Sequence, residues 1–133
     1  MSSAFRVQLS SSRRGAHLAR QLAVGRLARH GIARTTPTSF AIGAITAELA
    51  ANAVTHGRLP GRDFVLTLAL SSTTVRVEVL DGRPDLLPPT TANAPSSDAL
   101  GGRGLLVVDA FADRWGCVVR GTDAKYVWAE VNL

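Results

Sequence analysis

Two polar side chains, Glu48 and Asn52, stand four positions apart in a stretch otherwise rich in alanine. That spacing places both on one face of a helix. The carboxamide oxygen of Asn52 suits Mg²⁺, which takes few protein ligands beside the phosphates of a substrate. Glu48 could accept a proton from an attacking hydroxyl group. Taken alone, the pair is better explained as two solvated surface groups, so its interpretation depends on what else the chain offers.

A second candidate is Asp81, which follows the alternating valines of an expected strand and precedes Gly82 and Arg83. A carboxylate at the end of a buried strand points into whatever cleft the strand end lines. It can accept a hydrogen bond from an exocyclic amine, which is one way to recognise adenine. Asp-Gly is also ordinary turn chemistry, so a simple turn is the alternative.

A third candidate is the run from Gly101 to Leu105, in which Gly102 and Gly104 flank Arg103 just before an expected helix. Glycines at a helix start expose backbone N–H groups, and the helix dipole adds positive potential, so phosphate is the natural ligand. Arg103 can add a charge-assisted contact. The alternative is a flexible loop with a glycine hinge.

The elements that must position these groups follow from periodicity and breakers. Ser10–Ser12 offers N-cap candidates and Gly31 a helix stop. The pattern predicts an α+β fold with helices on one face of a sheet, in a single domain spanning residues 1–133. The expected elements are a strand over 4–9, helices over 13–30 and 37–55, strands over 63–70 and 75–81, a long loop over 82–103, a helix over 104–112, and a hairpin of 116–120 with 125–132.

Composition narrows the class of protein. There is one cysteine, Cys117, and no apolar run long enough for a membrane span or a secretory signal, which predicts a cytoplasmic protein with no membrane partner. Residues 1–40 hold seven arginines and no acidic residue, whereas residues 41–133 hold eight basic and ten acidic groups. The basic segment could attract nucleic acid or an acidic protein, but a solvated arginine face is the simpler interpretation, and nucleic acid is not the expected partner.

Together, the order and placement of the three candidates resemble the Bergerat-type nucleotide site of the GHKL ATPase and kinase superfamily. The helix with Glu48 and Asn52 resembles its N box, Asp81-Gly82-Arg83 its first glycine box, and residues 102–105 its second. The ending Lys125-Tyr-Val-Trp-Ala-Glu130 is similar to the small single-domain branch that contains the anti-sigma-factor serine/threonine kinases. The resemblance implies a two-layer sandwich with a mixed or antiparallel sheet.

The resemblance also implies roles for single residues. Glu48 would be the catalytic base toward a serine or threonine of a partner, Asn52 would hold Mg²⁺, and Asp81 would bind the adenine amino group. The glycines of the second box would close on the phosphates of ATP. The residues that the resemblance assigns to ATP binding are Asn52, Asp81, Gly82, Arg83, Gly102, Arg103, Gly104 and Leu105.

Two functions stay open at this point. The first is an ATP- and Mg²⁺-dependent kinase that phosphorylates an anti-sigma-factor antagonist and binds a sigma factor. The second is a non-catalytic anti-sigma or partner-switch module, because the usual Asp-x-Gly-x-Gly box is altered after Asp81 and Tyr126 stands where this branch often has a threonine near the base. A homodimer is a further option, through Phe5, Val7 and the first helix.

Overall fold

The computed structural model describes residues 2–55, 63–81, 104–120 and 124–133. Within these ranges the chain forms a five-stranded antiparallel sheet, in the order β1-β2-β3-β5-β4, and three helices. In chain order the elements are β1 (Ser3–Leu9), α1 (Arg13–Arg29), α2 (Pro37–Thr55), β2 (Phe64–Leu70), β3 (Thr74–Asp81), α3 (Gly104–Phe111), β4 (Arg114–Arg120) and β5 (Ala124–Asn132).

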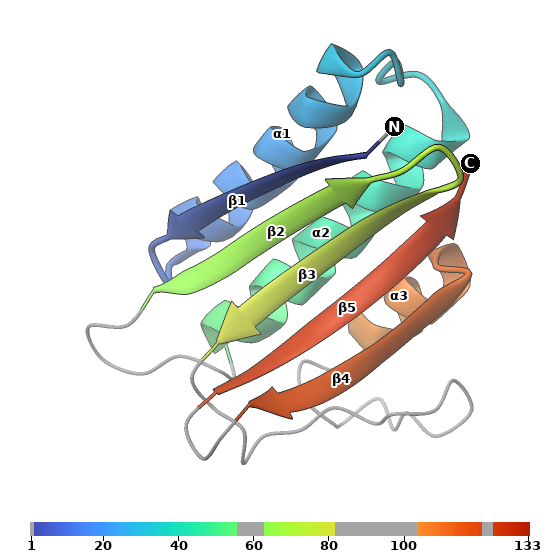
Figure 1. Ribbon diagram of the computed structural model, residues 1–133. Helices are drawn as coiled ribbons and strands as arrows, with labels where there is room; N and C mark the ends of the chain where they lie inside the picture. Colours follow the sequence, from blue (N-terminus) through green and yellow to red (C-terminus); the bar gives the residue numbers. More distant parts are fainter. Residues whose placement is uncertain (1, 56–62, 82–103, 121–123) are drawn as a thin grey trace.

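The three helices all lie against the same face of the sheet, which leaves the opposite face open (Figure 1). Helix α2 is the central one, since it packs against α1 on one flank and α3 on the other, and against β2, β3 and β5 below. This is a two-layer α+β sandwich, so the expected fold class and the placement of the helices on one face are confirmed.

Local chemistry sets the helix boundaries. The side chain of Ser12 caps α1 by accepting a hydrogen bond from the backbone N–H of Gly15 at 3.0 Å. Gly31 follows the helix with φ of +87°, a conformation that favours glycine, as expected for a stop signal. Thr36 caps α2 through its Oγ1, which accepts from the backbone N–H of Ser39 at 3.1 Å, and Pro37 fills the first helical position.

Alternation along the strands separates the two faces of the sheet. In β2, β3 and β5 every second side chain is buried beneath the helices, and the residues between them face outward. The core lies between this face and the apolar stripe of α2. Its fully buried larger side chains include Leu27, Ile42, Ile45, Leu49, Phe64, Leu66, Leu68, Val75, Val77, Val79 and Val108.

Phe5 and Val7 of β1 are half-buried and pack against this core from the same face of the sheet. The guanidinium group of Arg26 lies 4.5 Å from the centre of the Phe5 ring, a cation–π contact that closes the edge of the core. Both apolar side chains therefore take part in packing within the chain. Among the described helices, none is long and apolar enough to cross a membrane.

Candidate functional site

The sequence candidates gather at one end of the sandwich. The last turn of α2, the end of β3 and the beginning of β5 lie at this end, and α3 begins on the side that faces it (Figure 1). Asn52 lies in this turn of α2, and Asp81 is the last residue of β3. Lys125 is the second residue of β5, and Leu105 is the second residue of α3. Glu48 lies one turn before Asn52 on α2. Segments more than fifty residues apart in sequence therefore contribute to one region of the molecule.

Glu48 and Asn52 are both half-buried on α2. A helix turns about 100° per residue, so Asn52 lies on the side opposite Gly43, nine residues earlier. Gly43 is the position where α1 approaches, because a Cβ there would come within 3.1 Å of Val24. Glu48 and Asn52 therefore turn away from α1, toward the flank of α2 where α3 packs. Within the described ranges, neither side chain has a hydrogen-bond partner, so both polar groups are available to a ligand.

Asp81 is buried, with 8% of its surface exposed, and it lies on the same face of β3 as Val75, Val77 and Val79. Its partner across the strands is Lys125 of β5. The ammonium Nζ of Lys125 donates to Asp81 Oδ1 at 2.8 Å and to Oδ2 at 3.1 Å. Lys125 is itself only 4% exposed. The sequence reasoning identified the carboxylate but missed the lysine, although a lysine at an inward position of an alternating strand was a visible signal.

The remaining candidates divide into two groups. Leu105 is 1% exposed in the first turn of α3, and the backbone of Gly104 begins that helix. The packing of Leu105 suits a residue that anchors the helix start. The other nucleotide candidates, Gly82, Arg83, Gly102 and Arg103, lie outside the described residues, as does the expected loop over 82–103.

Cys117 lies near Asp81 and Lys125, and both charged groups influence the pKa of its thiol. Cys117 of β4 is half-buried and pairs in register with Val127 of β5. Burial raises the pKa of the Cys117 thiol above its ordinary value. The positive charge of Lys125 lowers that pKa in part, and the negative charge of Asp81 raises it further. This thiol is therefore held in its neutral form near neutral pH.

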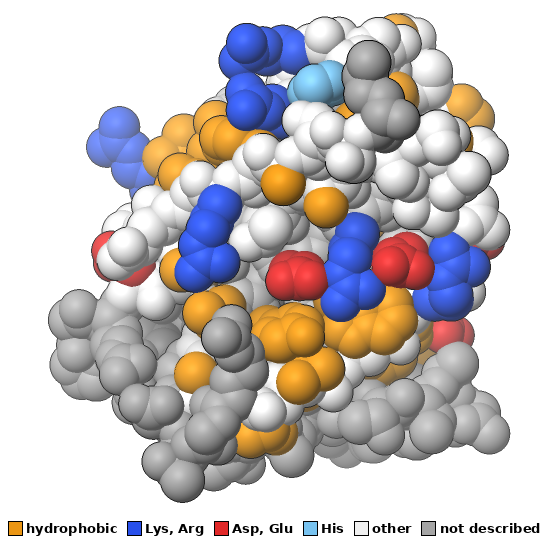
Figure 2. Space-filling model, viewed as in Figure 1, with side chains coloured by type: hydrophobic (Ala, Val, Ile, Leu, Met, Phe, Trp, Pro, Cys, Tyr) orange, Lys and Arg blue, Asp and Glu red, His pale blue; other side chains and the backbone are white. Residues whose placement is uncertain are grey.

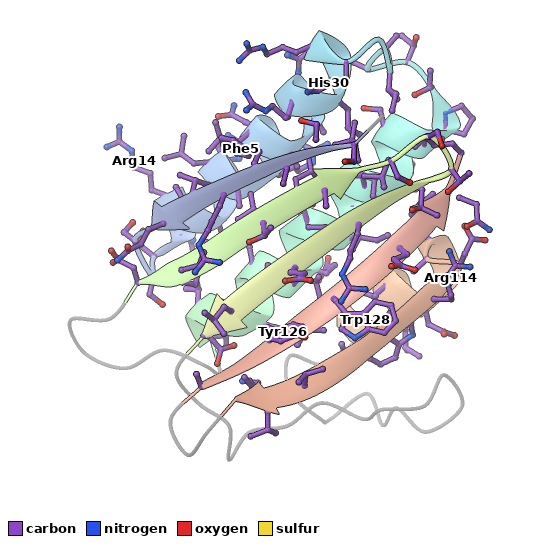
Figure 3. The ribbon with its side chains drawn as sticks, viewed as in Figure 1. Phe5, Arg14, His30, Arg114, Tyr126 and Trp128 are labelled. Carbon is purple, nitrogen blue, oxygen red and sulfur yellow. The ribbon has the colours of Figure 1, made fainter. Side chains whose placement is uncertain are left out.

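Tyr126 lies on the other face of the sheet, next to Leu80 and Val118 in register. Figure 3 shows Tyr126 and Trp128 on the open face, together with Arg114. The strand position that faces the same side as Asp81 is therefore Lys125, one residue earlier. A base held against Asp81 would meet the side chain of Lys125 and not that of Tyr126.

The open face carries its own charged cluster, which we call the open-face network: Arg76, Glu78, Glu130 and Arg114. Arg76 donates from Nε to Glu78 at 2.7 Å and from Nη1 to Glu130 at 2.9 Å, and Arg114 donates to Glu130 at 2.8 Å. The guanidinium of Arg76 also lies 4.4 Å from the centre of the Trp128 ring. Figure 2 shows basic and acidic side chains that alternate across this face, next to several hydrophobic side chains.

The open-face network shifts the pKa values of two of its members, Glu130 and Arg76. Hydrogen bonds from Arg114 and Arg76 hold the pKa of Glu130 below its ordinary value, although burial acts in the opposite direction. Burial alone would lower the pKa of Arg76, but its hydrogen bonds to Glu78 and Glu130 raise it above the ordinary value. Glu130 and Arg76 are therefore both charged near neutral pH.

A pocket of about 310 Å³ lies between α1 and α2, and sequence reasoning did not identify it. Its lining includes Arg20, Arg34, Ser39 and the exposed ring of Phe40. The hydroxyl of Ser39 is buried and has no hydrogen-bond partner. Neither arginine forms an ion pair with another described residue, so the pocket presents uncompensated positive charge beside an apolar ring.

The donor set of the site limits how a metal ion could bind. Within the ranges described, no group of three or more His, Cys, Asp or Glu side chains could hold a metal ion. A single amide ligand such as Asn52 fits Mg²⁺ only when phosphate oxygens and water complete the coordination sphere. The residues present therefore fit Mg²⁺ bound together with a nucleotide, and not Mg²⁺ bound alone.

Comparisons with known proteins agree with this fold. Residues 9–129 match the family model described as the histidine kinase-like ATPase domain. Among solved structures, the chain is similar to one in the crystal structure of the SiaB–SiaC complex from Pseudomonas aeruginosa, with a TM-score of 0.69 and 12% identity over 96% of this chain and 88% of that chain. At that identity the likeness shows a shared fold. No curated protein matches the sequence.

Proposed function

Because the chain belongs to the histidine kinase-like ATPase domain family, we propose that it is an ATP- and Mg²⁺-dependent serine/threonine kinase of the anti-sigma-factor type. It would phosphorylate an antagonist protein and bind a sigma factor in the cytoplasm. The observation that carries this proposal is the position of Asn52 and Asp81 on element ends at one end of the sandwich, with Glu48 one turn before Asn52 on α2.

Each residue has a separate task in this proposal. Asp81 accepts a hydrogen bond from the amino group of adenine, and Asn52 supplies one protein ligand to Mg²⁺. The metal, when bound with the nucleotide, neutralises charge on the phosphates. Glu48 accepts the proton of the partner's serine or threonine hydroxyl. At the same time the oxygen of that hydroxyl bonds to the γ-phosphorus of ATP, and the bond between the γ-phosphorus and ADP breaks. Gly102, Arg103 and Gly104 would contact the phosphates, with Leu105 anchoring the helix that follows, and Gly82 and Arg83 would border the base.

A protein is the partner class that the molecule supports best. The pocket between α1 and α2 combines the exposed ring of Phe40 with two arginines that form no ion pair with another described residue, which suits an acidic side chain next to an apolar one. Phosphate-backbone binding to nucleic acid would need a longer track of such contacts. The similar solved structure is itself a complex of two proteins.

The test separates nucleotide binding from phosphoryl transfer. Calorimetry with ATP and Mg²⁺ should detect binding that Asp81→Ala abolishes. The matched control Glu78→Ala, which changes an acidic residue on the open face of the same strand, should keep it. In assays with ATP labelled at the γ-phosphate and the cognate antagonist, Glu48→Gln should reduce transfer about 100-fold or more while ATP binding persists. Asp63→Asn, at an exposed acid that bonds to Gln8, is the matched control for that assay.

The alternative is a non-catalytic partner-switch module. Two observations favour it: the glycine box after Asp81 is altered, and the carboxylate of Asp81 is already engaged by Lys125. It predicts that the wild type forms a complex with its partner without ATP and leaves no phosphoserine or phosphothreonine on it. ATP binding that Asp81→Ala abolishes, together with transfer that Glu48→Gln abolishes, would contradict this alternative.

A further inference from the structure

The pairing of Lys125 with Asp81 has no role in the proposed function as stated so far. Lys125 is the only lysine in the chain, and its side chain is buried on the inward face of a strand whose other inward residues are apolar. Burying a charged pair is costly, and a well-packed apolar pair of similar size would often be at least as stable. Stability alone therefore gives little reason to place a lysine at this position.

The strand register fixes how the pair is presented. Asp81 and Lys125 are direct neighbours on antiparallel strands, at the end of β3 and near the beginning of β5. They place a hydrogen-bond acceptor and a hydrogen-bond donor side by side at the end of the sheet where the nucleotide candidates gather. Tyr126, the next residue, is on the opposite face. Lys125 is therefore the β5 side chain directly beside Asp81 on this side of the sheet.

Resting on the proposed function, we propose that Lys125 is a second base-reading residue. Asp81 accepts a hydrogen bond from the 6-amino group of adenine, and Lys125 Nζ donates one to ring atom N1, its neighbour on the same edge. Adenine presents a donor and an acceptor in adjacent positions, which is the complement of the carboxylate and the ammonium group. The role assigned to Lys125 is the choice of base, and not the transfer of phosphate.

When the base binds, it replaces one of the two hydrogen bonds between Asp81 and Lys125, and neither charged group is left without a partner. The base takes the place of the longer contact, at 3.1 Å, while the shorter contact at 2.8 Å keeps the two charges together. Each charged group then gains one hydrogen bond from the base in return for the one that is lost. A base with a 6-oxo group offers the acceptor and the donor in the reverse order, so the same orientation would leave both groups poorly satisfied.

The decisive experiment uses the wild-type protein and modified nucleotides. Calorimetry with Mg²⁺ compares ATP with 1-deaza-ATP, in which a C–H group replaces N1, and with GTP. We expect 1-deaza-ATP to bind about 10- to 100-fold more weakly than ATP, as for loss of a hydrogen bond to a charged group, and GTP to bind more weakly than ATP. Equal affinity for ATP and 1-deaza-ATP would overturn the inference and leave the proposed function standing, whereas a preference for GTP would contradict both.

A variant tests whether Lys125 causes the difference in affinity between ATP and 1-deaza-ATP. In Lys125→Met, ATP and 1-deaza-ATP should bind with equal affinity, whereas the matched control Arg76→Met, a cation on the open face of β3, should keep the difference. Circular dichroism checks that each variant is folded. If Lys125→Met does not fold, Lys125→Arg replaces it, and a reduced but persistent preference for ATP over 1-deaza-ATP is then the expected result. Absence of ATP binding by the wild type would instead refute nucleotide binding itself, and the inference with it.

Discussion

Strands β3 and β5 carry two clusters of opposite charges, one on each face of the sheet. The contact distances are nearly the same: 2.8 Å for Lys125 with Asp81, and 2.7 to 2.9 Å within the open-face network. What differs is exposure, since the side chains of the buried pair are 5% and 7% exposed and those of the open-face network 23% to 46%. Similar geometry therefore has different energetic consequences, because water screens one cluster and is excluded from the other.

This difference is the reason why we propose a binding role for only one of the clusters. Half-exposed ion pairs contribute little to stability and are common on sheet surfaces, so the open-face network needs no function to account for it. A buried pair carries a desolvation penalty that its mutual attraction only partly offsets. In the proposed role, the pair offsets this penalty by presenting a donor and an acceptor to the base.

The largest effect should come from breaking the buried pair on one side only. Lys125→Met removes the ammonium group that donates to both oxygens of the buried Asp81 carboxylate and should lower the free energy of unfolding by about 3–5 kcal/mol. The double variant Asp81→Leu/Lys125→Met should recover most of that loss, because no charge is then buried. Urea denaturation monitored by circular dichroism measures both values.

Arg76→Met is the matched control for the first prediction, and it should cost no more than about 1 kcal/mol. A loss in Lys125→Met as small as that in Arg76→Met would remove the energetic contrast between the two clusters. A double variant that is no more stable than Lys125→Met would show that the pair is held by more than its charges.

How far the sequence anticipates this structure can be seen in the same two strands. The alternation of Val75, Val77 and Val79 predicts which face of β3 is buried, and the Ser12 and Gly31 signals predict the limits of α1; all three are confirmed. Such features depend on residues close in sequence. β4 begins at Arg114, two residues earlier than expected, because its first residues pair with Ala129 and Glu130 of β5, a contact that periodicity within one segment does not reveal.

The candidate site was only partly predictable, for the same reason. Glu48 and Asn52 could be placed on one helix face because both lie within one helix. The contact between Asp81 and Lys125 joins residues 44 positions apart, and it depends on the register between β3 and β5. Only the inward position of a lysine in an otherwise apolar alternation hinted at it. The roles of Gly82, Arg83, Gly102 and Arg103 stay predictions.

A smaller effect should come from the open-face network, and it should depend on pH. Glu130→Gln removes the carboxylate that Arg76 and Arg114 share, and should cost at most about 1 kcal/mol at pH 7. The pKa of Glu130 is lowered in the folded state, so its contribution is complete above the unfolded value of about 4.3 and is lost as pH falls through the lower folded value. The stabilities of wild type and variant should therefore converge in acid.

Urea denaturation between pH 7 and pH 2 measures this convergence. Asp63→Asn, an exposed acid with one hydrogen bond to Gln8, is the control and should change stability less at every pH. A difference between Glu130→Gln and wild type that stays constant down to pH 2 would mean that the carboxylate charge does not contribute, and that the network acts only by packing.

The smallest effect is on the reactivity of Cys117, and it tests whether the two clusters act on separate faces. Because burial raises the pKa of this thiol, the pH midpoint for its alkylation by iodoacetamide should lie above the ordinary value of about 8.5. Lys125 lowers that pKa and Asp81 raises it, so Lys125→Met should move the midpoint further up and Asp81→Asn should move it down. Glu130→Gln, whose change is confined to the open face, should leave it in place.

Cys117 is the only cysteine in the chain, so total alkylation followed by mass spectrometry reports on this one thiol. The midpoint is a better measure than the rate, because partial unfolding of a variant would speed alkylation without reproducing a shift in the opposite direction for the Lys125 and Asp81 variants. A midpoint that moves with Glu130→Gln as much as with Lys125→Met would mean that charge on the open face reaches the buried side of the sheet. In that case the buried pair could not be treated as an isolated recognition element, and its proposed contact with the base would have to be evaluated together with the open-face network.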